Sequence, residues 1–147
     1  MKQQYKVIGI MSGTSLDGVD IAFCRFIFEN RNWKYVLEKS ETIAYSPVWK
    51  KKLSELENAS AFDFALANEE YGAFLGNLVK SFSKKYFFKP DFISSHGHTI
   101  FHQPEKKITF QIGSGAAIAA ACNLPVVCDF RTLDVAFGGQ GAPLVPI

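Results

Sequence analysis

A glycine-bearing turn near the N-terminus carries the residue types that bind phosphate. Two apolar runs, Tyr5–Ile10 and Ile21–Phe28, are typical of strands and flank the polar segment Ser12–Asp20. Gly13 and Gly18 allow close backbone approach, and converging N–H groups form a concavity that binds anions. We therefore interpret the turn as a phosphate loop and its ligand as a nucleotide. An ordinary hairpin turn is the alternative, since Asp-Gly is a common hairpin dipeptide.

Two familiar phosphate-binding patterns are absent from this segment. There is no GxxxxGK[ST] sequence, so the turn is not a Walker-type P-loop. No helix is expected to follow the turn, so a helix dipole is not what attracts the anion.

All three histidines lie in one polar segment that follows an expected buried strand, Asp91–Ser95. His96 and His98 would share a face if the strand continued, and His102 could then complete a metal site of the kind that hydrolases use. We expect Gly97 to end the strand, which argues against such a site. Structural histidines, or histidines that orient sugar hydroxyls, are the other interpretations.

A charged segment follows the last expected strand, Pro125–Phe130. The guanidinium of Arg131 suits a carboxylate or a phosphate. Asp129 and Asp134 lie on either side of it, so an internal Arg–Asp pair is an equally strong interpretation. The glycines that follow are typical of a hinge or a close-packed loop.

The elements that must position these residues follow from periodicity and turn signals. A turn at Asn30–Asn32 predicts that the first three strands form an antiparallel meander. Ser46 and Ser60 are placed to cap two helices, and the second helix carries an apolar stripe at three- and four-residue steps. The expected strands are residues 5–10, 20–28, 33–45, 91–95, 108–112 and 125–130, and the expected helices are 47–58, a long one after Ser60, and 115–122.

This order predicts an α/β fold in which the three-strand meander and further parallel strands form a mixed sheet with helices on its faces. Open sheets of this kind bind ligands at the carboxyl ends of their strands. The segments after Ile10, Ser95 and Phe130 are all such ends, and we expect them to converge on one cleft.

Composition restricts the class of protein. The 147 residues are 48% hydrophobic, which suits one globular domain, and the net charge of +2 does not favour a nucleic-acid partner. The apolar stretches are too short for a membrane span, and the N-terminus has no signal-peptide pattern. Cys24, Cys122 and Cys128 lie in apolar runs, so we expect reduced thiols in a cytoplasmic protein.

Four segments together resemble the anhydro-N-acetylmuramic acid kinase family. They are Gly9–Asp20, Ser95–Thr99, Gln111–Gly113 and Asp129–Pro146, and the similarity runs along essentially the whole chain in the family's order. The resemblance implies an actin-like, hexokinase-like ATPase with a ribonuclease H-like domain. It also implies a sugar kinase of peptidoglycan (murein) recycling that uses ATP and Mg²⁺. Such enzymes open the 1,6-anhydro ring of the sugar with water and phosphorylate it to N-acetylmuramic acid 6-phosphate.

The resemblance assigns site residues by their motifs. The ATP-binding residues would be Gly13, Thr14, Ser15, Leu16, Asp17, Gly18, Val19 and Asp20. Either Asp17 or Asp20 would hold Mg²⁺ through water. The sugar would contact His96, Gly97, Thr99 and Arg131, with Arg131 facing its lactyl carboxylate.

The chain departs from the family in two ways. The family usually has Gln where this chain has His98, and its catalytic aspartate lies in a downstream D-x-G-P-G-N motif that these 147 residues do not contain. The catalytic base is therefore assigned neither to Asp129 nor to Asp134, and we expect it beyond Ile147.

We expect residues 1–147 to be an N-terminal nucleotide- and sugar-binding lobe that is inactive without a second lobe. The face that the second lobe would leave uncovered favours self-association, so a homodimer is one expected assembly. A non-catalytic actin-like nucleotide-binding module, and a metal-dependent hydrolase built on His96, His98 and His102, are the alternative functions.

Overall fold

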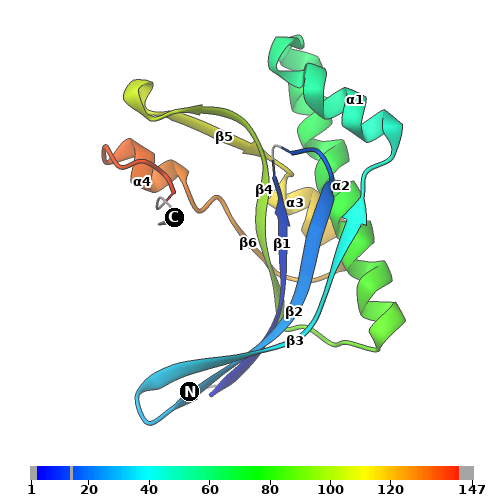
Figure 1. Ribbon diagram of the computed structural model, residues 1–147, viewed down its shortest axis with the longest axis vertical. Coiled ribbons are helices and arrows are strands. Elements are labelled where there is room, and N and C mark those ends of the chain that lie inside the picture. Colours follow the sequence, from blue (N-terminus) through cyan, green and yellow to red (C-terminus); the bar gives the residue numbers. More distant parts are fainter. Residues whose placement is uncertain (1–2, 14, 143–147) are drawn as a thin grey trace.

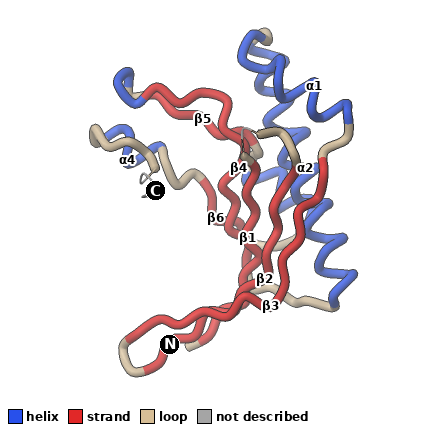
Figure 2. The backbone as a smooth tube through the Cα atoms, in the orientation of Figure 1, coloured by secondary structure: helices blue, strands red, loops and turns tan. Residues whose placement is uncertain are grey.

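The computed structural model describes residues 3–13 and 15–142 and confirms the predicted α/β class (Figure 1). Its strands form one mixed sheet of order β3-β2-β1-β4-β5, with β6 also beside β4 (Figure 2). The strands are β1 (Gln4–Ser12), β2 (Gly18–Glu29), β3 (Asn32–Ala44), β4 (Phe92–Gln103), β5 (Ile108–Ile112) and β6 (Val126–Cys128). The helices are α1 (Pro47–Glu55), α2 (Ala61–Tyr86), α3 (Gly115–Cys122) and α4 (Thr132–Ala136).

The predicted antiparallel meander is confirmed. β1 pairs with β2 and β2 with β3, both antiparallel, whereas β4 joins β1 in parallel. The turn between β2 and β3 has φ values of 50° at Asn30 and 62° at Arg31. Two consecutive positive φ values are typical of the tight turns that match the twist of a hairpin.

Both predicted helix caps are present. The Ser46 hydroxyl accepts a hydrogen bond from the Trp49 N–H, and a short 3₁₀ turn extends α1 to Asn58. The Ser60 hydroxyl accepts from the Asp63 N–H at 3.1 Å and so begins α2. No helix of the described residues is long and apolar enough to cross a membrane.

The expectation that Gly97 ends a strand is wrong, because β4 runs through it to Gln103. Gly97 has a φ of 74°, and the pairing of β4 with β1 changes register beside it. A Cβ at this position would lie 2.4 Å from the Ile112 carbonyl oxygen of β5. The glycine therefore forms a bulge, which lets β4 bend away from β1 and pair with β5 in its second half.

The last expected strand is shorter than predicted, and a helix that the sequence did not indicate follows it. β6 ends at Cys128, and Asp129 has a φ of 61°. The Asp129 carboxylate accepts hydrogen bonds from the N–H and the hydroxyl of Thr132. These local side-chain hydrogen bonds turn the chain at Asp129 and therefore end the strand before Phe130.

One face of the sheet is covered by α1, α2 and α3 (Figure 1). The predicted apolar stripe of α2 is buried there at Tyr71, Leu75, Val79 and Phe82. Helix α3 approaches α2 at two glycines. A Cβ at Gly76 would lie 2.6 Å from the Ala121 Cβ and 2.8 Å from the Ile118 carbonyl oxygen.

We predict that Gly76→Ala destabilises the protein by about 1–3 kcal/mol, because overpacking outweighs the roughly 1 kcal/mol that alanine adds in helix propensity. Asn77→Ala is the matched control, since Asn77 is exposed on the next position of α2, and it should be neutral or stabilising. Urea unfolding of both variants measures the difference. A Gly76→Ala protein as stable as the control would contradict close packing of α2 against α3.

Candidate functional site

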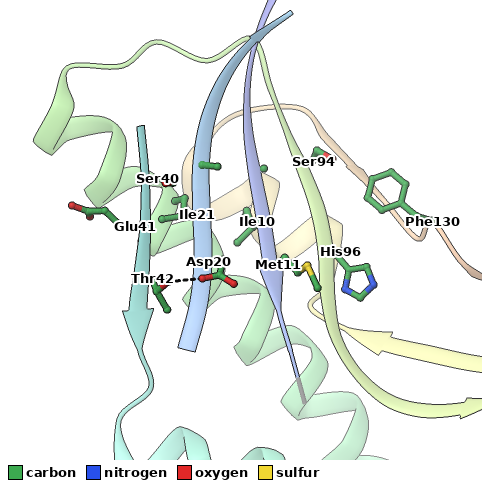
Figure 3. Close-up of a pocket in the computed structure, with 12 residues that line it drawn as sticks. Ile10, Met11, Asp20, Ile21, Ser40, Glu41, Thr42, Ser94, His96 and Phe130 are labelled. Atoms are coloured by element: carbon green, nitrogen blue, oxygen red, sulfur yellow. Dashed lines mark hydrogen bonds between the residues drawn. The ribbon is translucent and has the colours of Figure 1, made fainter. Parts of the chain in front are cut away.

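The sheet face that the helices leave open contains a cleft of about 590 Å³ (Figure 3). Its floor is a row of small residues in register across four strands, namely Ser40, Ala22, Gly9 and Ser94. Successive strand residues point to opposite faces, so the same strands send Ile8, Ile10 and Ile21 into the core. Small side chains on one face thus leave a hollow where large ones would fill it.

Polar groups border this cleft beside the carboxyl end of β1 and the Gly97 bulge of β4. Asp20 lines one side and accepts a hydrogen bond from the Thr42 hydroxyl at 2.5 Å. His96 and Phe130 line the other side (Figure 3). Met11 lines the same cleft, so the segments after Ile10 and Ser95 do converge as predicted, whereas Phe130 itself, and no described residue after it, lines this cleft.

The turn between β1 and β2 is partly closed on itself. The Leu16 N–H donates to the Gly13 carbonyl at 3.4 Å, and the Gly18 N–H donates to the Asp17 carboxylate at 2.9 Å. Within the described part of the chain, the Ser15 N–H has no hydrogen-bond partner, whereas the Asp17 N–H is hydrogen-bonded to the carboxylate of its own side chain. The Ser15 amide of the turn is thus available to an acceptor. Thr14, which the resemblance also assigns to ATP, lies outside the described residues.

The Asp17 carboxylate is held in its charged form by the turn itself. The Ser15 hydroxyl donates to it at 2.8 Å, and this bond, together with the Gly18 N–H, lowers the pKa of Asp17 below its usual value. Hydrogen bonds to the ionised form favour that form. One carboxylate oxygen of Asp17 therefore organises the turn.

Packing explains three of the residues that the resemblance assigns to ATP. It accounts for the side chains of Leu16 and Val19 and for the absence of a side chain at Gly18. The Val19 side chain is fully buried, and Leu16 packs against the same core. A Cβ at Gly18 would lie 2.4 Å from the Ile43 carbonyl oxygen, so this glycine permits close pairing of β2 with β3. Any ligand contact of Val19 or Gly18 would come from the backbone.

A chain of buried hydroxyl groups fixes the base of the turn. The Tyr45 and Tyr71 hydroxyls are 2.5 Å apart, and Tyr71 donates to the Ser12 hydroxyl at 2.8 Å. Ser12 in turn donates to the Gly97 carbonyl at 3.2 Å. Burial raises the pKa of Tyr71 and of Tyr45, so both hydroxyls stay protonated. This path of hydrogen bonds joins the end of β3, helix α2, β1 and the bulge of β4.

The predicted metal-binding alternative is not supported. His98 is buried and its ring packs edge-on against Tyr71 of α2, whereas His96 lines the open cleft. The bulge at Gly97 lies between them and separates their side chains. His102 is bonded to the Thr109 hydroxyl instead. Among residues 3–13 and 15–142, no three His, Cys, Asp or Glu side chains are grouped to hold a metal ion.

Arg131 lies near His96, although it does not line the cleft among the described residues. The charge of Arg131 lies close enough to His96 to contribute to its lowered pKa, although burial of the imidazole is the larger cause. Asp134 accepts from the Gly141 N–H at 2.7 Å rather than pairing with Arg131. Thr99 pairs with Gln111 in β5 and does not line the cleft.

We assign no catalytic residue among the described residues. Residues 143–147 lie outside the described residues, and they include Ile147 and the last part of the segment that resembles the family. The expectation that the catalytic base lies beyond Ile147 therefore stays a prediction. The two aspartates that precede this segment have local partners instead, because Asp129 accepts from Thr132 and Asp134 accepts from Gly141.

The sequence placed Ser12 in the predicted turn but did not indicate that its hydroxyl binds other elements, and it did not indicate Tyr45 at all. Tyr71 belongs to the predicted apolar stripe of α2, so only its packing was expected. A tyrosine in a buried stripe does carry a signal, because a buried phenolic hydroxyl usually has a hydrogen-bond partner. The small residues of the cleft floor also carry a signal in the sequence. Gly9 and Ala22 each lie between two large apolar residues, and this alternation along a strand indicates that they face the side opposite the core.

A mixed sheet of order β3-β2-β1-β4-β5, with a meander, a parallel crossover and a polar cleft at the strand ends, defines an actin-like ATPase-type domain. The family model of anhydro-N-acetylmuramic acid kinase matches residues 5–147. The chain belongs to this family.

Named relatives agree with the family match. Proteins named anhydro-N-acetylmuramic acid kinase from Bacillus thuringiensis subsp. konkukian (strain 97-27), Bacillus cereus (strain AH187) and Bacillus anthracis (strain A0248) are each 38% identical to this chain over 151 residues. Each alignment covers 95% of this chain and 40% of the relative. The chain thus spans well under half the length of these relatives.

We predict that Tyr71→Phe lowers the free energy of unfolding by about 1–3 kcal/mol, because the buried hydroxyls of Tyr45 and Ser12 lose a partner. Tyr35→Phe is the matched control, since Tyr35 is 72% exposed on β3 and should tolerate the change. Chemical denaturation compares the two. Equal stability of both variants would show that the hydroxyl chain does not hold these elements together.

Proposed function

We propose that the full-length protein is an ATP-dependent sugar kinase of cell-wall recycling in the cytoplasm. It hydrolytically opens 1,6-anhydro-N-acetylmuramic acid and phosphorylates the freed 6-oxygen, which gives N-acetylmuramic acid 6-phosphate and ADP. The observation that carries this proposal is the family match over residues 5–147, with relatives that bear the kinase name. Residues 1–147 supply the N-terminal lobe and are inactive alone, because the catalytic base lies beyond Ile147.

The turn between β1 and β2 supports a phosphate site. Its unpartnered Ser15 N–H suits a phosphate oxygen, and Gly13 adds no side chain in front of it. Phosphoryl transfer depends mainly on positioning and charge neutralisation. The turn provides positioning through the Ser15–Asp17 hydrogen bond, which holds the backbone in one conformation.

A nearby carboxylate fits the magnesium ion that accompanies ATP. Asp20 lines the cleft and keeps one oxygen on Thr42, whereas Asp17 belongs to the turn. Either carboxylate would hold Mg²⁺ through water, as this ion keeps several of its waters. When bound, the ion neutralises charge on the phosphates.

The sugar fits on the other side of the cleft, beside His96, and Arg131 is near enough for its charge to act on this imidazole. The guanidinium of Arg131 matches the lactyl carboxylate of the sugar in charge and geometry. His96 stays neutral because burial and the Arg131 charge both lower its pKa. A neutral imidazole binds polar sugar groups without repelling Arg131.

The test is ATP turnover by the full-length protein, measured by coupled ADP detection with and without the anhydro-sugar. We expect ADP release that requires the sugar, and a phosphorylated sugar of matching amount. Nucleotide binding without any turnover would instead favour the non-catalytic module. Release of ADP with no phosphorylated sugar would also contradict the proposal.

We predict that Arg131→Ala raises the KM for the sugar by about tenfold or more while the KM for ATP changes little, because one charged hydrogen-bond partner of the carboxylate is lost. Lys34→Ala is the control, since it removes a positive charge from the exposed β2–β3 hairpin. Steady-state kinetics with each substrate varied in turn separates the two effects. Unchanged sugar kinetics in Arg131→Ala would remove the assignment of Arg131.

A further inference from the structure

A second, smaller cavity lies beside the cleft. This crevice has a volume of about 220 Å³ and is bordered by β4, the end of β5, the start of α3 and the segment after β6. His96 lines both the cleft and the crevice, so the two cavities are neighbours. The crevice is too small for a whole sugar derivative and suits one substituent of a ligand.

Ser95 contributes a buried hydroxyl to the crevice that the fold does not use. The residue is 1% exposed, and its Oγ has no hydrogen-bond partner among the described residues. Buried hydroxyls almost always have a partner, and leaving one unpaired costs free energy. An unpaired group of this kind at the wall of a cavity indicates that a ligand supplies the partner.

The start of α3 adds hydrogen-bond donors at the same place. The Ser114 hydroxyl already accepts from the Ala117 N–H, but the first amides of a helix have no partner within it. Gly115, the first residue of α3, lines the crevice. Its lack of a side chain is required, because a Cβ there would lie 2.7 Å from the Cys128 sulfur.

The charge of the crevice excludes an anion as the preferred ligand. Among the described residues that line it there is no lysine or arginine, and Asp129 contributes a carboxylate. Arg131 lies near His96 but outside this lining, so a phosphate or carboxylate group in the crevice would meet the Asp129 charge without a cation in contact with it. A neutral group with an acceptor oxygen fits Ser95 and the α3 amides better.

His96 requires that the neutral group also carry a donor. Its Nδ1 lies 3.1 Å from the Gly97 carbonyl oxygen, which can only accept, so Nδ1 carries the proton. The other ring nitrogen, Nε2, is then an acceptor, and it is buried without a partner in the described structure. An N–H or O–H group of a ligand would satisfy it.

We propose that the crevice binds the acetamido group of the amino sugar, with its carbonyl oxygen accepting from the Ser95 hydroxyl and the first amides of α3 and its N–H donating to His96 Nε2. This inference rests on the proposed function and names the part of the sugar that enters the crevice. Ser95 is then a specificity-determining residue that distinguishes an acylamino sugar from one with a hydroxyl in the same position.

The experiment compares two sugars with the full-length protein: 1,6-anhydro-N-acetylmuramic acid, and its analogue in which a hydroxyl replaces the acetamido group. We expect kcat/KM to favour the acetamido sugar by about tenfold or more, because a site built for a polar group discriminates against its loss. Ser95→Ala should reduce this ratio about tenfold. Its melting temperature should not fall, since the Ser95 hydroxyl has no described partner to lose.

Ser83→Ala is the matched control. Ser83 in α2 also has a hydroxyl without a partner among the described residues, but it borders a different cavity beside Phe88 and Lys89. This variant should keep the wild-type ratio. Equal use of both sugars by the wild-type protein, or an unchanged ratio in Ser95→Ala, would overturn the inference while leaving the kinase function intact. Absence of any sugar phosphorylation would instead refute both.

Discussion

The candidate site depends on the buried hydroxyl of Ser12. This one group receives a hydrogen bond from Tyr71 and donates one to the Gly97 carbonyl, so it joins helix α2 to the bulge of β4. Tyr45 continues the path to the end of β3. The turn begins directly after Ser12, and His96 directly precedes Gly97. The position of the turn relative to His96 is therefore set in the core rather than at the surface. Each hydroxyl on the path donates one hydrogen bond to the next group. Removal of any one hydroxyl therefore leaves a neighbouring buried group without its partner.

Backbone geometry explains why the site opens on one face only. The bulge at Gly97 turns the second half of β4 away from β1, which places β5 and the segment after β6 beside His96. The row of small residues that includes Gly9 and Ala22 leaves the cleft hollow. The helices fill the other face with large apolar side chains. Binding space and core are thus made by the same strands through the alternation of their side chains.

Much of the fold could be predicted from the sequence because its signals are local. The caps at Ser46 and Ser60, the turn at Asn30 and the stripe of α2 each depend on a few neighbouring residues. The length of β4 could not be predicted, since a glycine with positive φ ends a strand or forms a bulge depending on a partner strand that is distant in sequence. The hydroxyl path from Tyr71 joins residues 26 and 59 positions apart, and periodicity carries no information about such contacts.

A nucleotide that binds in the proposed way places its phosphates against the backbone amides of the turn between β1 and β2. The most direct measurement follows the backbone amide resonances of the full-length protein by NMR as ADP and Mg²⁺ are added. We expect the largest shifts at Gly13 and Ser15, and none at Asn30 and Arg31, which form a turn at the opposite end of β2. Nucleotide binding that leaves the Gly13 and Ser15 amides unchanged would contradict a phosphate site at this turn.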